Sequence, residues 1–232
     1  MSRLREHNDV LLTKQTLLTV LHDLSSRLLA SFGHQVRLIV HGGAVMVLHS
    51  LLHNRKSTRD VDYIHRAFAS EYRRYGTRDA EARLKSCIAA TAYAHGLGAD
   101  WMNAHADVAL PMARDAYGRS YDPIHYAAVT EVNLQNNTIF SAPGLLLVSV
   151  SWPWAVALKF VRYQKDDPVD IAAMLRLGHH QAKVRWSRAI LEEWVTRWCW
   201  PMGYSSYPPP HLESLRQRMR HAIGLAYGQI RA

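Results

Sequence analysis

A short run of apolar and β-branched residues, Val36-Arg37-Leu38-Ile39-Val40, predicts a buried strand early in the chain. Gly42-Gly43 follows and interrupts this pattern, and Ala44 to Leu52 continues as a short apolar helix. Upstream, apolar residues recur at helical spacing from Val10 to Leu29 and predict an amphipathic helix that ends at Phe32-Gly33. The order of helix, strand, glycine turn and helix favours a fold in which helices pack on a sheet.

A second strand is predicted from Asp60 to Ile64, where polar and apolar residues begin to alternate. Alternation places Asp60 and Asp62 on one face, with Cα atoms roughly 6.5 to 7 Å apart, and turns Val61 toward the core. Two carboxylates on one face of a buried strand repel each other unless a cation joins them, and Mg²⁺ suits such oxygen ligands. The alternative interpretation is two surface acids, one of them a helix cap.

The glycine pair adds a second element to this site. Between a strand and a helix, the absent side chains of Gly42 and Gly43 let backbone N–H groups approach a phosphate closely. The alternative is a tight turn without a ligand. Taken together, the turn and the acids predict a phosphate cradle beside a metal-holding strand.

The rest of the chain is predicted to be mostly helical after a further piece of sheet. A helix is expected from Arg78 to His95, and two strands, Thr130 to Phe140 and Leu145 to Val150, are expected as a hairpin at the edge of the sheet. Together these elements predict an α+β fold, in which a mixed sheet with flanking helices occupies residues 1–151 and a helical lobe occupies residues 152–232.

Three features of the helical lobe are predicted from its prolines and acids. Pro153 stands in the first turn of a helix. A second helix runs from Asp167-Pro168, with Asp167 as its N-cap, to Leu177-Gly178. Tyr207-Pro208-Pro209-Pro210 is expected to be extended before a last helix.

Charge and composition limit the partners. With 28 Lys and Arg residues against 19 Asp and Glu residues, the formal net charge of +9 favours anionic partners such as nucleotides or RNA. No run approaches the ~20 apolar residues of a membrane span, so no membrane partner and a cytoplasmic or nuclear location are expected. Two cysteines, Cys87 and Cys199, are too few for a disulfide framework and are not spaced as a zinc site.

The run His41-Gly42-Gly43-Ala44, followed by Ser57-Thr58-Arg59-Asp60-Val61-Asp62, resembles the Gly-Gly and Thr-x-Asp-x-Asp signature of the DNA polymerase β-like nucleotidyltransferase superfamily. It is most similar to the minimal nucleotidyltransferases and the relatives of abortive-infection toxins. A second patch, Lys159, Arg162 and Lys165-Asp166 with Asp170-Ile171, resembles the basic helix of those proteins, with one extra residue between Asp166 and Asp170. The likeness spans roughly Val36 to Leu177.

The resemblance implies transfer of a nucleoside monophosphate from an NTP, with ATP the expected substrate, to an unidentified small molecule, protein or RNA. It implies two Mg²⁺ ions held by Asp60 and Asp62. By the same resemblance Gly42, Gly43 and Thr58 form the nucleotide site, and Lys159, Arg162 and Lys165 contact its phosphates. The alternative for the basic helix is a solvated face whose cations pair with Asp166, Asp167 and Asp170.

Active members of that superfamily usually carry a third carboxylate on a later strand, and the runs Val132 to Phe140 and Leu145 to Val150 contain none. Glu131 at a strand edge and Asp107 in an unplaced segment are the candidates for it. Two further functions are therefore kept: a catalytically inactive nucleotide- or RNA-binding module on the same fold, and an interaction protein that uses the tryptophan-rich tail.

Overall fold

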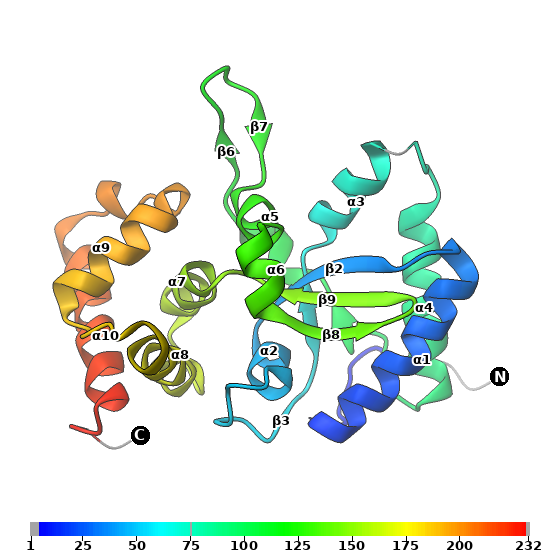
Figure 1. Cartoon of the computed structure of the whole chain (residues 1–232), viewed down its shortest axis with the longest axis horizontal. Coiled ribbons are helices and arrows are strands. Elements are labelled where there is room, and N and C mark those ends of the chain that lie inside the picture. Colours follow the sequence, from blue (N-terminus) through cyan, green and yellow to red (C-terminus); the bar gives the residue numbers. More distant parts are fainter. Residues whose placement is uncertain (1–4, 75, 231–232) are drawn as a thin grey trace. The chain divides into compact units, whose positions relative to one another are not determined.

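The computed structural model describes residues 5–74 and 76–230, and the chain forms two compact units (Figure 1). One unit comprises the chain up to Leu110 together with His125–Val150, and the other comprises Pro111–Ile124 together with the residues from Ser151 onward. The fold is α+β, with a mixed sheet, flanking helices and a helical carboxy-terminal region, which confirms the predicted fold class. Within the described ranges, every helix is too short or too polar to cross a lipid bilayer.

The first unit is built on a five-stranded sheet in the order β5-β4-β2-β9-β8. Strand β2 lies parallel to β9 and antiparallel to β4, β4 lies parallel to β5, and β8 returns antiparallel to β9 as an edge hairpin. The strands are β2 (Val36–His41), β4 (Val61–Tyr63), β5 (Met102–Asn103), β8 (Thr138–Ala142) and β9 (Leu145–Ser149). A small separate pair joins β1 (Leu12–Thr13) to β3 (Ser57–Thr58).

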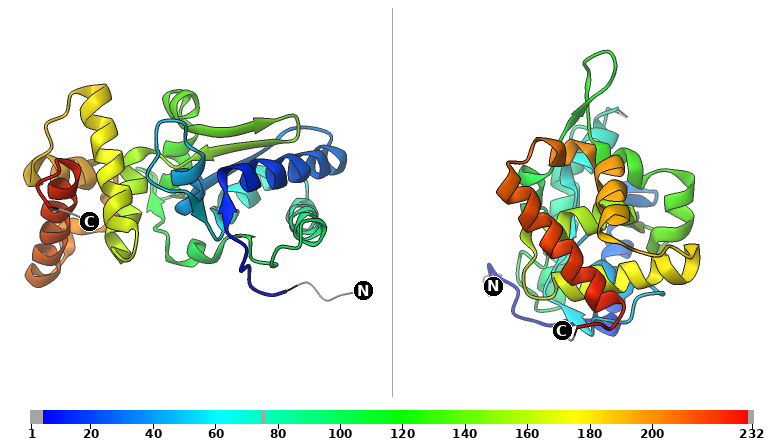
Figure 2. Two further views of the ribbon diagram at one scale, coloured as in Figure 1. Left: turned by 90° about the horizontal axis from the view of Figure 1, so that it is seen from below. Right: turned by 90° about the vertical axis from the view of Figure 1, so that its left-hand side faces the viewer.

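Helices cover this sheet, and α1 runs along one side of it (Figure 2). Thr13 caps α1 by accepting a hydrogen bond from the Thr16 backbone N–H, and Gly33 ends the helix in a left-handed conformation, as the sequence predicted. The helices of this unit are α1 (Lys14–Phe32), α2 (Gly43–Leu48), α3 (His65–Arg74), α4 (Ala80–Ala94), the 3₁₀ turn η1 (His105–Ala109) and α6 (Glu131–Asn137). The chain also passes through β6 (Ala113–Arg114), β7 (Ser120–Tyr121) and α5 (Pro123–Ala128).

The core of the first unit lies on the side of the sheet where Val36, Leu38 and Val40 project from β2. These residues are buried against the apolar stripe of α1 and the inner face of α4. The alternate β2 residues Arg37 and His41 are only partly buried, so the opposite side of this strand carries its polar groups. The acids discussed below lie on that polar side.

The predicted strand from Thr130 to Phe140 is wrong over its first half, which forms α6. Thr130 caps this helix by accepting a hydrogen bond from the Asn133 backbone N–H at 3.4 Å. The Asn133 amide is buried and donates to the carbonyls of Ala128 and Ser149, both at 2.9 Å. These hydrogen bonds favour a helix over a strand at this point, and the pattern of apolar residues does not reveal them.

The second unit contains α7 (Trp152–Arg162), α8 (Asp167–Ala182), α9 (Arg188–Trp198), η2 (Trp200–Met202), η3 (Tyr204–Ser206) and α10 (Pro209–Ala226). Two predicted boundaries need correction here. The N-cap position of α8 is Asp166, because the Asp167 carboxylate is engaged by Lys159 and Arg162. The helix also continues past Gly178, where the absent side chain makes room for the Trp186 ring.

The proline segment is extended only at Tyr207 and Pro208. Pro209 and Pro210 already belong to the first turn of α10, so the prediction that all four residues are extended is wrong. The reason is that the first helical turn needs no backbone N–H donor, and the fixed φ of proline suits it.

Candidate functional site

The second predicted strand, Asp60 to Ile64, is shorter in the structure, where β4 comprises only Val61–Tyr63. Asp60 directly precedes β4, Asp62 lies within it, and both are half-buried, whereas Val61 and Tyr63 are buried. Strand β4 lies between β5 and β2 in the sheet, and Asp62 pairs with His41 of β2 in the antiparallel register. The two carboxylates therefore project from the polar side of the sheet, beside the end of β2.

The pKa of the Asp60 carboxyl is raised above its ordinary value. Burial is the largest cause, and the negative charge of Asp62 adds to it, while a hydrogen bond from the Asn103 side chain acts in the opposite direction. Because Asp62 contributes to the shift, the two carboxylates are close enough to repel each other. A cation bound beside the two acids would favour the charged form of Asp60 and so act against this increase.

The glycine turn brings the backbone against these acids. Gly42 adopts φ +77° and ψ −148°, a conformation that is almost restricted to glycine. A Cβ atom at this position would lie 2.5 Å from Asp62 Oδ2. A Cβ atom at Gly43 would collide with the Thr58 hydroxyl and lie 3.2 Å from an Arg55 guanidinium nitrogen. The space freed by the glycines is thus shared with protein side chains, and its use by a phosphate stays a prediction.

Arg55 lies in the basic segment that follows α2, and Thr58 lies in β3. The Thr58 side chain is buried, and its hydroxyl donates a hydrogen bond of 3.2 Å to the Asp60 carbonyl, so it shapes the turn that delivers the acids. Sequence analysis singled out Thr58 but not Arg55. Arg55 could have been found only as part of the charge-rich run between residues 53 and 59.

Two further polar residues reach the acids from β5 and the loop before it, and sequence analysis missed both. Asn103 stands beside Asp62 in the parallel register between β4 and β5, and its side chain bonds to Asp60. Asp100 lies near enough for its charge to raise the pKa of Asp60. Strand β5 has only two residues, which is too short a run to produce a recognisable alternating pattern.

Asp100 is itself fixed by the amino-terminal segment. Its Oδ1 accepts a hydrogen bond of 2.6 Å from the Asn8 backbone N–H, and its Oδ2 lies 3.0 Å from His7 Nδ1. The Asn8 side chain also donates to the Arg59 carbonyl at 2.6 Å, immediately before the first acid. A single buried asparagine therefore connects the segments that lead into β4 and β5.

The two residues proposed as a third acid have other partners. Asp107 in η1 accepts a hydrogen bond of 2.8 Å from the Arg66 backbone N–H. Glu131 lies in the first turn of α6, is exposed, and accepts a hydrogen bond of 3.3 Å from Gln135. Neither is among the groups that shift the pKa of Asp60, whereas Asp100 is. A role for Asp107 or Glu131 in completing the site stays a prediction.

The three cations expected to contact phosphates belong to the second unit. Lys159 is buried, and its ammonium group donates to Asp170 at 2.6 Å and to Asp167 at 3.3 Å. Arg162 donates two hydrogen bonds to the Asp167 carboxylate, at 2.9 and 3.0 Å. Lys165 is exposed and has a left-handed backbone. The alternative interpretation, in which local acids are the partners of the basic helix, accounts for Lys159 and Arg162 without a nucleotide.

No group of three or more His, Cys, Asp and Glu side chains within residues 5–74 and 76–230 is arranged to hold a metal ion. The oxygen ligands at this place are the carboxylates of Asp60 and Asp62, because the Asn103 amide oxygen accepts a hydrogen bond from the His105 backbone N–H. Two carboxylates are a set that Mg²⁺ accepts when water and phosphate complete its coordination. Comparison with known proteins finds no matching family model, no matching curated protein and no matching solved structure.

Proposed function

We propose that this protein is a metal-dependent nucleotidyltransferase that moves a nucleoside monophosphate from an NTP to an acceptor. The observation that carries the proposal is the pair of carboxylates beside the glycine turn. Asp60 and Asp62 repel each other at partly buried positions, and burial and this repulsion raise the pKa of Asp60. Because both causes disfavour the charged form of Asp60, a cation bound beside the two acids would stabilise that form, and a carboxyl group with a shifted pKa in such a place favours a functional site.

The surrounding residues support an ionised, metal-ready pair. The Asn103 amide donates to Asp60 and favours its charged form. Gly42 lets Asp62 lie directly against the backbone, which limits the positions open to its carboxylate. Arg55 brings a cation beside the same turn, where an anionic phosphate would be attracted. When bound, Mg²⁺ would join the carboxylates to phosphate oxygens and neutralise the developing charge of the leaving pyrophosphate.

A second candidate function is nucleotide or RNA binding without catalysis. It is favoured by the residue beside Asp62 on β5, which is Asn103 rather than an acid. An amide is a neutral ligand and a poor proton acceptor, so it cannot supply the base that a third carboxylate would provide. The two candidates share the same acids and differ only in turnover.

Binding and turnover can be separated with the whole chain. We expect ATP with Mg²⁺ to raise the melting temperature of the wild type, and we expect Asp62→Asn to abolish that increase because it removes a metal ligand. Asp9→Asn is the matched control, since Asp9 is 81% exposed and pairs only loosely with Arg5. The other three NTPs, each with and without Mg²⁺, test the base preference.

Release of pyrophosphate decides between the two candidates. A wild type that binds Mg²⁺ and NTP and releases pyrophosphate in the presence of RNA, protein or small-molecule acceptors supports the transferase, provided that Asp62→Asn does not. Metal-dependent binding without release under all these conditions supports the non-catalytic module. Failure of every NTP, and of RNA, to shift the melting temperature in the presence of Mg²⁺ would exclude both.

A further inference from the structure

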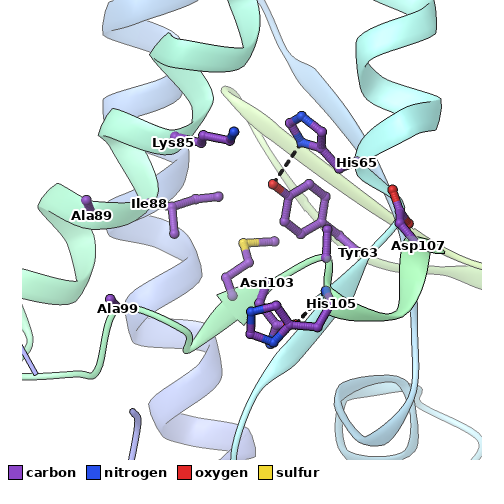
Figure 3. Close-up of a pocket in the computed structure, with 11 residues that line it drawn as sticks. Tyr63, His65, Lys85, Ile88, Ala89, Ala99, Asn103, His105 and Asp107 are labelled. Carbon is purple, nitrogen blue, oxygen red and sulfur yellow. Dashed lines mark hydrogen bonds between the residues drawn. The ribbon is translucent and has the colours of Figure 1, made fainter. Parts of the chain in front are cut away.

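A pocket lies at the β5 edge of the sheet, on the first unit. Its volume is about 490 Å³, within the range of small-molecule sites. Figure 3 shows Lys85 of α4 and Tyr63 of β4 extending toward each other across it. The apolar part of its wall is formed by Ile88, Ala89, Ala99, Met102 and Ala104. The pocket therefore combines an apolar floor with polar groups on opposite sides, which is the usual composition of a ligand site.

Lys85 gives the pocket a cation that the protein leaves available. Its side chain is exposed, and its charge helps to lower the pKa of Glu81, but among the described residues no hydrogen bond or close ion pair engages its ammonium group. The neighbouring imidazole of His65 is occupied, because its Nε2 lies 2.8 Å from Glu81 Oε2 and its Nδ1 lies 3.0 Å from the Tyr63 hydroxyl. One available ammonium group suits a singly charged carboxylate, whereas a dianionic phosphate usually gathers several donors.

Asp107 gives the wall an acceptor without a donor. Its Oδ2 is bonded to the Arg66 backbone, but its Oδ1 is buried and has no hydrogen-bond partner within residues 5–74 and 76–230. Burial raises the pKa of this carboxyl group, as expected for an acid that lacks full solvation. A buried acceptor is destabilising until a donor reaches it, and a hydroxyl group on a ligand would provide one.

We propose that this pocket binds a small hydroxy acid. Its carboxylate pairs with Lys85, its hydroxyl donates to Asp107, and its apolar body lies on Ile88 and Met102. The inference does not depend on nucleotidyl transfer, because Lys85, Ile88 and Met102 lie outside the proposed metal and nucleotide site, and Asp107 is used here only for its buried oxygen without a donor. It adds a small-molecule ligand that the acids and the glycine turn do not explain.

The test uses three aromatic probes on the whole chain, with binding followed by amide chemical shifts. The probe is 4-hydroxyphenylacetate, and its two comparison compounds are 4-hydroxyphenylacetamide, which lacks the charge, and phenylacetate, which lacks the hydroxyl. We expect each comparison compound to bind about fivefold more weakly than the probe, the size of effect that one exposed ion pair or one hydrogen bond provides. The largest shift changes should fall at Ile88, Ala89 and Met102.

Substitution of the cation supplies the matched control. Lys85→Met should bring the probe down to the affinity of its amide, whereas Lys14→Met, at an exposed position of α1, should leave the difference unchanged. The proposal is overturned if the probe and either comparison compound bind equally, if Lys85→Met behaves like Lys14→Met, or if the shift changes lie away from this pocket. Absence of any shift change up to the solubility of the probe also overturns it.

Discussion

Two pairs of aspartates, one in each unit, show opposite responses to burial. Asp167 and Asp170 of α8 are fully buried, yet Lys159 and Arg162 surround them, and hydrogen bonds from Arg162 and the Gln164 backbone help to lower the pKa of Asp167. Asp60, next to Asp62, is less buried but has a raised pKa. Cations of the protein favour the charged form in the first pair, whereas in the second pair the charge of Asp62 disfavours the charged form of Asp60. Burial alone therefore does not decide the pKa of an aspartate, because the neighbouring charges can outweigh it.

The largest expected effect comes from removing Lys159, the buried cation between Asp167 and Asp170. Lys159→Met should lower the free energy of unfolding by about 3 to 5 kcal/mol, because it leaves Asp167 and Asp170 buried without the ammonium group between them. Urea unfolding measures the change. Lys165→Met is the control, and as an exposed position it should change stability by less than about 0.5 kcal/mol. Equal effects of the two variants would contradict the role given to Lys159.

A smaller loss is expected at the turn that carries the repelling pair. Gly42→Ala should lower the free energy of unfolding by about 2 to 3 kcal/mol, since alanine is strained at φ +77° and its Cβ would lie 2.5 Å from Asp62 Oδ2. Adding Asp62→Ala should recover part of the loss by removing the collision, while the strain remains. Gly118→Ala is the control, because it shares a positive φ but has open space around its Cβ. A Gly42 effect no larger than that of Gly118 would show that the collision does not matter.

The fold should become more stable when the charge of Asp60 is removed. Asp60→Asn keeps the shape of the side chain and removes its repulsion with Asp62, so without Mg²⁺ it should raise the free energy of unfolding by about 0.5 to 1 kcal/mol at neutral pH. Asp167→Asn should have the opposite sign, because it weakens the ion pairs with Lys159 and Arg162. A destabilised Asp60→Asn variant would contradict the inference that the charge of Asp60 opposes folding while that of Asp167 favours it.

The smallest effect is the pH dependence of these two substitutions. The folded pKa of Asp60 lies above 3.8, so its charge destabilises the fold at neutral pH, and the gain from Asp60→Asn should shrink as the wild type takes up that proton on acidification. The folded pKa of Asp167 lies below 3.8, so its stabilising charge is kept at that pH and lost only on further acidification. Urea unfolding at neutral pH and at pH 3.8 should therefore show the Asp60 difference reduced and the Asp167 difference retained.

The sequence predicted the parts of the fold that depend on local pattern. The apolar run at Val36 to Val40, the glycine turn and the helix that ends at Gly33 are each specified by neighbours a few residues away. Helix α6 could not be predicted in this way, because the buried amide of Asn133 is satisfied by a carbonyl of β9 that lies sixteen residues ahead. Helix α3 was not predicted, although its buried residues Phe68 and Tyr72 recur at helical spacing.

In the candidate site, too, residues in a local motif could be predicted, and residues placed by distant contacts could not. Asp60, Asp62 and the two glycines could be found because they occur in a short motif on adjacent elements. Asn103 and Asp100 could not, since their closeness to Asp60 is set by the pairing of β4 with β5. The partners of Lys159 were available in the sequence as the acids near residue 170, and only their burial distinguishes an ion pair inside the fold from a solvated surface.

The hydrogen bonds of Asn8 affect when, during folding, Asp60 and Asp100 reach their positions. The Asn8 side chain and backbone reach Arg59, Gly98 and Asp100, which lie 51, 90 and 92 residues further along the chain. During synthesis, Asn8 can therefore form all of these hydrogen bonds only after about a hundred residues have left the ribosome. A cut or a bulky label near Asn8 would loosen Asp60 and Asp100 together, although neither is its neighbour in sequence.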